Sequence, residues 1–148
     1  YREVANQHPE IGYEERIVDA TAMALVMNPN AFDVLVMENL SGDILSDLGA
    51  GLIGGLGMAP SANIGVEASV FEAVHGTAPD IAGKGLANPT ALLLSATEML
   101  RHVGQPAVAE RIERALFKTF ETKEALTGDL GGRATTKSFA EAVVSHLS

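Results

Sequence analysis

Cysteine and tryptophan are absent from the 148 residues, and only 5% of the residues are aromatic. Without cysteine the chain can form neither disulfides nor thiolate metal sites, and the redox compartment is left open. The core has to be aliphatic, with methionine as filler, because 47% of the residues are nevertheless hydrophobic. This length and composition fit one domain of ordinary size, so we expect no internal boundary within residues 1–148.

Basic residues are scarce as well, since 10 Lys and Arg stand against 19 Asp and Glu, for a net charge of −9. This surplus argues against nucleic acid or an anionic membrane as partner and suits a site that holds a cation. No apolar run approaches the ~18 residues of a membrane span. The start resembles no targeting segment, so the default location is the cytoplasm, or mitochondria in a eukaryote. Tyr1–Gln7 has the pattern of a helix already under way, which indicates part of a longer polypeptide.

The most informative stretch is Asn39–Asp47, which follows the Val-rich run Phe32–Met37. The apolar run predicts a buried strand, and the pattern after Gly42 predicts a helix. Asp43 and Asp47 would then lie one turn apart on one helix face. Asp43 could cap the start of that helix, whereas Asp47 has no such role. A divalent cation would explain both carboxylates, and hard oxygen ligands suit magnesium or manganese, although the spacing fits a solvated helix face equally well.

Strand and helix patterns alternate through the first half of the chain, which is typical of an α/β sheet with crossover helices. Asp19 could cap the second helix, and Asn28-Pro29-Asn30 should end it. The expected strands are Tyr13–Val18, Phe32–Met37 and Val70–Val74, and the expected helices are Ala20–Met27, one from Asp43, Thr90–Val103, one from Pro106, and Thr135–Leu147. Thr90–Val103 is apolar nearly all round, so we expect it to be buried on more than one face. The helix from Pro106 is amphipathic, with Val108, Ile112, Leu116 and Phe120 on its apolar face.

Three Gly-rich connections separate these elements. Gly51–Gly65 does not match the GxGxxG dinucleotide fingerprint, and we interpret it as a closely packed turn. His75–Asn88 mixes glycine with His, Asp, Lys and Asn, so it is either a binding loop or a plain surface crossover. Thr127–Arg133 is a Gly-rich turn before the last helix.

Four segments then occur together and in order: Asn39–Asp47, Ala59–Gly65, His75–Gly83 and Ala87–Thr90. With them the chain resembles the C-terminal half of the isocitrate and isopropylmalate dehydrogenases, the metal-dependent β-decarboxylating dehydrogenase family. The likeness covers essentially all 148 residues. It implies an α/β fold with a largely parallel sheet and flanking helices, distinct from the Rossmann fold. Members oxidise a 2-hydroxy acid by hydride transfer to NAD or NADP, and the product then loses carbon dioxide.

The resemblance implies roles for three acids. Asp43 and Asp47 would bind Mg²⁺ or Mn²⁺ together with the substrate's hydroxyl and carboxylate. Asp19 matches a third acid that the family supplies across a homodimer interface to the partner's site. A cation there would lower the pKa of the bound hydroxyl and stabilise the negative charge that develops during oxidation and decarboxylation.

The His75–Asn88 loop matches the family's cofactor-binding loop, with His75 and Asn88 at positions that contact the adenosine part of the cofactor. Asp80 followed by Ile81 resembles the members that prefer NAD, because a carboxylate can accept hydrogen bonds from ribose hydroxyls and would repel a 2′-phosphate. The implied NAD-binding residues are His75, Gly76, Thr77, Ala78, Pro79, Asp80, Ile81 and Asn88.

Other features depart from the family pattern. Ser41 stands where an aromatic is usual, and Glu38 where a neutral residue is common, so an extra carboxylate flanks the metal-binding turn. The family's general-acid Lys and Tyr would lie upstream of Tyr1, so we expect the 148 residues alone to be inactive.

Among substrates, Glu15–Asp19 and Met99–Gly104 resemble isocitrate enzymes most. Isopropylmalate, homoisocitrate and tartrate-type substrates stay open. Two other classes remain: a non-catalytic regulatory subunit of isocitrate dehydrogenase, and a binding module without chemistry. Regulatory subunits tend to lose their metal-binding acids, whereas Asp19, Asp43 and Asp47 are all present here.

Overall fold

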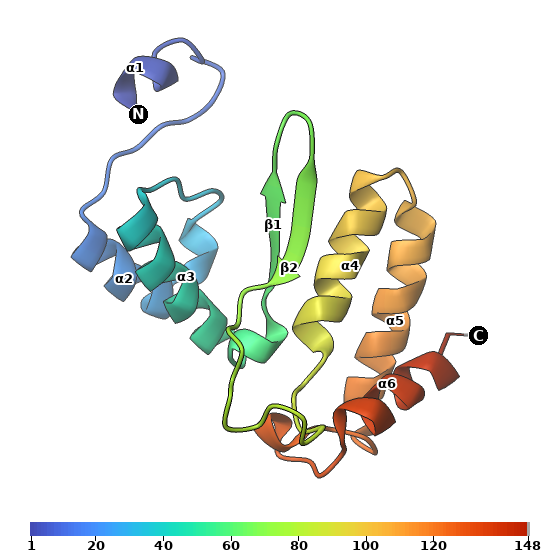
Figure 1. Ribbon diagram of the computed structural model, residues 1–148. Coiled ribbons are helices and arrows are strands. Elements are labelled where there is room, and N and C mark those ends of the chain that lie inside the picture. The colour runs from blue at the N-terminus through green and yellow to red at the C-terminus, as the bar shows by residue number, and fades with distance from the viewer. Residues whose placement is uncertain (148) are drawn as a thin grey trace. The chain divides into compact units, whose positions relative to one another are not determined.

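Helices make up most of the regular structure in the computed structural model, which describes residues 1–147 (Figure 1). The chain forms two compact units, unit 1 from Tyr1 to Gly49 and unit 2 from Ala50 onward. The helices are α1 (Arg2–Ala5), α2 (Val18–Met27), α3 (Asn39–Leu52), α4 (Thr90–His102), α5 (Pro106–Thr122) and α6 (Thr136–Ser145), and the strands are β1 (Pro60–Ile64) and β2 (Ser69–Ala73). Short 3₁₀ helices are η1 (Pro29–Ala31), η2 (Leu56–Met58) and η3 (Gly128–Leu130).

Unit 1 contains α1, α2, η1 and most of α3. The expected stop after α2 is confirmed, because the helix ends at Met27 and Pro29 begins η1. Its start differs by two residues, since Ile17 occupies the N-cap position and Asp19 lies in the first turn. The Asp19 Oδ1 atom accepts a hydrogen bond from the amide of Ala20 at 2.6 Å. Asp19 therefore places a negative charge near the helix N-terminus, where the helix dipole favours it, without being the cap.

Two of the three expected strands do not form within residues 1–147. Residues 13–17 and 32–38 belong to no helix or strand, and Val18 already lies in α2. Val34 and Val36 are 77% and 70% exposed, so this segment is not buried as the apolar pattern predicted. A strand forms only when a neighbour supplies ladder hydrogen bonds, and no segment of residues 1–147 pairs with these two.

The sheet that the described residues do form lies in unit 2. β1 and β2 pair antiparallel, with Ser61 opposite Glu72, so the largely parallel sheet is not formed within residues 1–147. β2 matches the expected strand closely, whereas β1 lies in a stretch interpreted as a turn. Gly65 closes the hairpin by donating its amide to the carbonyl of Ala68 at 3.0 Å. A Cβ at this position would lie 2.6 Å from that same oxygen, so the turn requires glycine.

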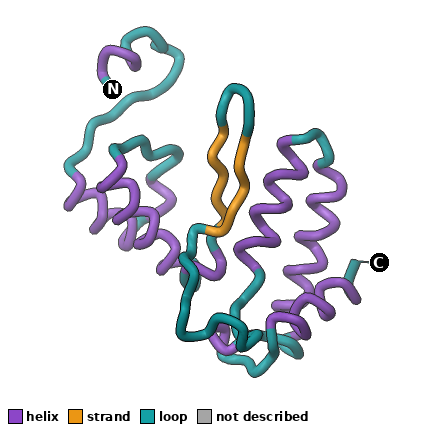
Figure 2. Tube along the Cα trace, viewed as in Figure 1, coloured by secondary structure: helices purple, strands orange, loops and turns teal. Residues whose placement is uncertain are grey.

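α4 lies between the hairpin and α5 (Figures 1 and 2). The buried hydroxyl of Ser95 accepts from the amide of Ser61 at 3.2 Å and lies 2.7 Å from the carbonyl of Glu72, so it links the helix to both strands. Burial on more than one face was expected for this helix and is found toward the hairpin and α5, although Leu92 is 58% exposed.

The core of unit 2 lies where α5 meets α6. The predicted amphipathic pattern of α5 is confirmed, because Leu116 is fully buried and Phe120 packs against the cluster. Phe139 of α6 is also fully buried, and its ring centroid lies 5.9 Å from that of Phe120. Thr135 begins α6 with a capping box, in which its hydroxyl accepts from the amide of Ser138.

A partly buried ion pair joins α4 to α5. Both terminal nitrogens of Arg101 donate to the carboxylate of Glu113, and Thr97 Oγ1 donates to the same carboxylate at 2.8 Å. The Arg101 guanidinium, opposed by partial burial and aided by Thr97, keeps the pKa of Glu113 below its usual value of 4.5. The pair therefore favours the folded state most when Glu113 is ionised in both states.

Replacing Glu113 with glutamine is expected to lower the free energy of unfolding by about 1 kcal/mol at neutral pH. The folded-state pKa is depressed, so this stabilisation is fully present above pH 4.5 and is lost as the pH falls through the folded-state pKa. Urea unfolding of wild type and variant at pH 7 and at acid pH should show the difference shrinking. Glu110→Gln on the same helix, whose carboxylate is 3.9 Å from exposed Arg114, should change little at either pH.

No helix among residues 1–147 has the length and apolar character needed to cross a membrane.

Candidate functional site

The two acids of the sequence motif lie within α3, not at its start. The helix begins at Asn39, and the amide of Gly42 already donates to the carbonyl of Glu38 at 2.8 Å. Asp43 is thus a full turn inside the helix, and the interpretation of this residue as an N-terminal cap is wrong. Asp43 and Asp47 keep their spacing of four residues, so both carboxylates project from one face of α3.

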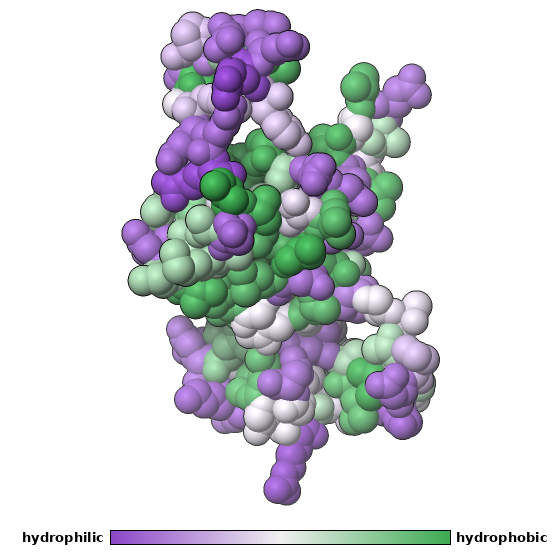
Figure 3. All heavy atoms as spheres, turned by 90° about the vertical axis from the view of Figure 1, so that its left-hand side faces the viewer, coloured by the Kyte–Doolittle hydropathy of each residue, from purple (hydrophilic) through white to green (hydrophobic). Residues whose placement is uncertain are grey.

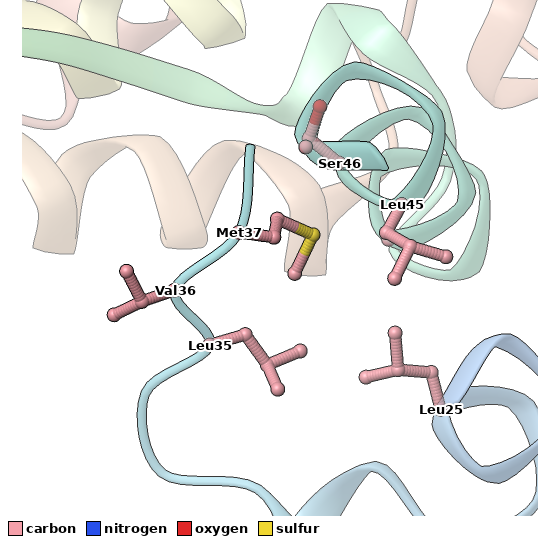
Figure 4. A pocket seen from close by; sticks show the side chains of 8 residues that line it. Leu25, Leu35, Val36, Met37, Leu45 and Ser46 are labelled. Carbon is pink, nitrogen blue, oxygen red and sulfur yellow. The ribbon is translucent and has the colours of Figure 1, made fainter. Parts of the chain in front are cut away.

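The packing of α3 in unit 1 determines which way this face points. Leu45 is 5% exposed, and it lines an open apolar pocket of about 480 Å³ with Leu25 of α2. Figure 4 shows Leu35 and Met37 directed toward this pocket and Val36 directed away from it. Because the apolar face of α3 is turned into the pocket, the neighbouring face with the acids is left to solvent.

Asp43 and Asp47 are both exposed, and neither side chain has an ion pair or a hydrogen bond to another side chain among residues 1–147. Two adjacent like charges on a helix are destabilising unless a positive group lies between them. Carboxylate oxygens are the donors that Mg²⁺ and Mn²⁺ prefer, so the pair fits two ligand positions of such an ion. Within the described residues, however, no three His, Asp or Glu side chains come together, so Asp19 does not complete the set within one chain.

The connection between β2 and α4 is an ordered loop whose first half is held by its own turns. The carbonyl of Ala78 accepts from the amides of Ile81 and Ala82 at 3.0 and 3.1 Å, and the carbonyl of Ile81 accepts from Lys84 at 3.1 Å. Ala78 has φ 41°, a left-handed conformation that is costly for a residue with a Cβ. Such strain in an exposed loop is typical of a functional segment.

Most of the predicted NAD-binding residues are accessible in this loop. His75, Gly76, Thr77, Ala78, Pro79 and Asp80 are exposed, and Ile81 is half-buried. The Nδ1 atom of His75 lies 3.0 Å from the carbonyl oxygen of Gly76, which favours the tautomer with its proton on Nδ1. The other ring nitrogen, Nε2, is then an acceptor that a ligand can use.

Asn88 is placed differently from the rest. It is 7% exposed, its Oδ1 accepts from the amide of Thr90 at 3.0 Å, and its Nδ2 donates to Asp129 Oδ2 at 2.9 Å. The side chain therefore holds the start of α4 and ties it to η3. The Nδ2 atom also donates to Met58 Sδ at 3.6 Å. A contact between Asn88 and a nucleotide stays a prediction, and it would use the second acceptor position of Oδ1.

Asp129 is the residue that sequence reasoning missed at this site. It lies in the segment that was interpreted only as a Gly-rich turn, and it is 41 residues from its partner Asn88. Gly57 packs beside the pair, since a Cβ there would meet Asn88 Cβ at 3.4 Å and Asp129 Oδ2 at 3.5 Å. Nothing in the sequence pattern links these three positions, so no local signal could have found the cluster.

With the fold and the site described, the comparison with known proteins gives the class. Residues 1–143 match the family model "Isocitrate/isopropylmalate dehydrogenase". The chain belongs to the isocitrate/isopropylmalate dehydrogenase family.

Among curated relatives, the chain is 57% identical over 147 residues to a mitochondrial catalytic chain of NAD isocitrate dehydrogenase from Arabidopsis thaliana. It is 53% identical over 148 residues to a mitochondrial regulatory chain of NAD isocitrate dehydrogenase from Dictyostelium discoideum. Each alignment covers 99% of this chain, but 39% and 42% of the relative. The chain thus spans about two fifths of the length of the relatives it matches.

The crystal structure of isocitrate dehydrogenase from Methylococcus capsulatus superposes with a TM-score of 0.92 at 53% identity, covering 99% of this chain and 44% of that one. The chain therefore has the fold of the corresponding part of that enzyme.

Proposed function

We propose that this chain is the C-terminal part of an NAD-dependent, β-decarboxylating dehydrogenase that converts isocitrate to 2-oxoglutarate with Mg²⁺ or Mn²⁺. The observation that carries the proposal is the pair Asp43 and Asp47, which is exposed, unneutralised and held on one face of α3. A solvated helix face would gain nothing from two uncompensated acids at this spacing. A catalytic family member needs them as metal ligands.

Each acid has a defined role in this proposal. Asp43 and Asp47 would supply carboxylate oxygens to hold the cation next to the substrate's hydroxyl and carboxylate. When bound, the cation would supply Lewis-acid stabilisation of the negative charge that develops on the substrate, and NAD would accept the hydride. Glu38 is also exposed, just before α3, so it can add to the negative potential that attracts the cation.

The exposed part of the His75–Asn88 loop is proposed to bind the adenosine portion of NAD. His75 offers an acceptor at Nε2. Asp80 is exposed within the hydrogen-bonded turn that starts at Ala78, where its carboxylate can accept from ribose hydroxyls. The same charge disfavours a 2′-phosphate, so NAD is the expected cofactor and NADP the poor one.

Apolar surface on unit 1 supports a larger assembly. Hydrophobic residues are prominent in the view of Figure 3, and exposed apolar side chains of α2 and α3 include Val18, Met23, Val26, Met27, Leu40 and Ile44.

We propose that upstream strands pair with residues 13–17 and 32–38 to complete a largely parallel, non-Rossmann sheet. We further propose a homodimer in which Asp19, exposed on α2, completes the partner's metal site.

A regulatory subunit is the second candidate, and high identity to one such protein favours it. The retained acids Asp19, Asp43 and Asp47 favour catalysis over this alternative. Isopropylmalate, homoisocitrate or a tartrate-type acid would use the same metal chemistry. The residues that read the substrate's side group are not identified in this chain, so the substrate needs a direct test.

The test is formation of NADH or NADPH by the full-length protein with Mg²⁺, supplied with isocitrate and isopropylmalate in parallel and with NAD or NADP. Turnover of isocitrate is expected, with kcat/KM for NAD at least about tenfold above that for NADP. Turnover of isopropylmalate alone would contradict the substrate assignment and keep the mechanism. No turnover of either, with an upstream sequence lacking the Lys and Tyr, would favour the regulatory subunit or the binding module.

A further inference from the structure

The two halves of the His75–Asn88 loop are anchored differently within unit 2. Among the described residues, the backbone hydrogen bonds of residues 78–84 all lie within the loop's own turns. The second half is tied to a distant segment: the amide of Thr136 donates to the carbonyl of Gly85 at 2.8 Å, and its hydroxyl donates to the carbonyl of Ala87. Thr136 therefore makes two hydrogen bonds to this loop, and its hydroxyl partner Ala87 is 49 residues away in the sequence.

Consecutive backbone turns join the exposed part of the loop to the residues that Thr136 holds. The turn that contains Asp80 closes on Ala78, the next one joins Ile81 to Lys84, and Gly85 follows at once. Gly85 has φ 64°, a backbone conformation that glycine adopts freely. Backbone rotation at Gly85 would let the loop move, unless hydrogen bonds from another segment held the residues around it. The two bonds from Thr136 fix the carbonyl of Gly85 and that of Ala87 just beyond it.

The element that presents Thr136 is rigid. Thr136 is the first residue of α6, directly after the N-cap Thr135, which makes the capping box with Ser138. Three residues further along, Phe139 is fully buried in the core of unit 2. Because the packing of Phe139 in the core anchors this first turn, the Thr136 hydroxyl holds a fixed position, which is what a supporting residue for a binding loop requires.

We propose that Thr136 is a positioning residue for NAD binding, which holds the loop in its binding conformation through the carbonyl of Ala87. This inference rests on the proposed function, because it takes the loop to be the NAD site. Thr136 itself need not touch the cofactor. Its loss should weaken NAD binding by loosening the loop, and should leave the metal site and the chemical step as they are.

The experiment compares Thr136→Val and Thr136→Ser in the full-length protein. Valine has the shape of threonine without the hydroxyl and keeps the amide bond to Gly85, whereas serine restores the hydroxyl. Thr136→Val is expected to raise the Kd for NAD, measured by calorimetry, and the KM for NAD about threefold to tenfold at an unchanged kcat. Hydrogen exchange at the amides of residues 78–87 should become faster in the absence of NAD, and serine should restore all three values.

Thr135→Ala is the matched control, because it removes the cap of α6 and leaves the Thr136 hydroxyl in place. It should lower the thermal midpoint without changing NAD affinity. An unchanged Kd in Thr136→Val, failure of serine to restore it, or an equal loss of affinity in Thr135→Ala would each overturn the inference. Absence of NAD binding by the wild type would instead overturn the proposed function, and this inference with it.

Discussion

Replacing Asp47 with asparagine in the full-length protein is expected to reduce Mg²⁺-dependent turnover on the order of 10³-fold or more while leaving the fold intact. Asparagine keeps the size of the side chain but removes the charge that a hard cation needs from its ligand. Several kcal/mol of charge stabilisation are at stake, and each 1.36 kcal/mol corresponds to about a factor of ten in rate. Because Asp47 is exposed and unpaired within residues 1–147, its loss breaks no structural contact there.

The measurement pairs steady-state kinetics with Mn²⁺ binding followed by electron paramagnetic resonance, so that loss of the ion is seen directly. Glu124→Gln serves as the control, since Glu124 is another exposed acid without an ion pair among the described residues. It should match the wild type in both assays, and far-ultraviolet circular dichroism should be the same for all three proteins. Full turnover by Asp47→Asn would show that the acid pair is only a solvated face of α3.

Sequence rules predicted the second half of this chain well because its helices carry local signals. Pro106 begins α5, the expected apolar periodicity runs along it, and the capped α6 starts within one residue of its prediction. Gly104 ends the preceding helix with φ 79°, a conformation suited to glycine. These signals act within a few residues, so they can be read without knowledge of the rest of the fold.

The strands were harder because pairing is not local. Phe32–Met37 has the composition of a buried strand, yet within residues 1–147 it has no partner, and Val36 is 70% exposed. β1 was missed for the opposite reason, since its Pro, Ser and Asn resemble a loop until β2 pairs with it. Composition indicates which segments can become strands, but a neighbouring strand decides whether they do.

The candidate site likewise contains features that local sequence predicts and features that depend on distant contacts. The spacing of Asp43 and Asp47 places them on one face despite the error in the helix start, because i and i+4 share a face wherever the helix begins. The hydrogen bonds around Asn88 could not be predicted from the sequence, since Asp129 is 41 residues away and lies in a turn without a distinctive pattern. Helical spacing thus predicted the shared face of the two acids, while the supports of the proposed cofactor loop required the tertiary structure.

Phe139→Ala is expected to lower the free energy of unfolding by about 3–5 kcal/mol, the usual cost of deleting a buried aromatic ring. Phe139 is fully buried, and it packs against Leu116 and the ring of Phe120. Truncation leaves a cavity between α5 and α6 that the capped helix cannot easily close. Urea unfolding of the full-length protein, followed by circular dichroism, should show a lower midpoint.

Phe117→Ala is the matched control on α5, because Phe117 is 57% exposed and its ring also lies against Phe120. It should cost less than about 1 kcal/mol, since little apolar surface is buried there. Equal losses in the two variants would contradict the placement of the core at the α5–α6 contact. The comparison also bears on the cofactor loop, because α6 carries Thr136: a loosened α6 in Phe139→Ala should weaken NAD binding, and Phe117→Ala should not.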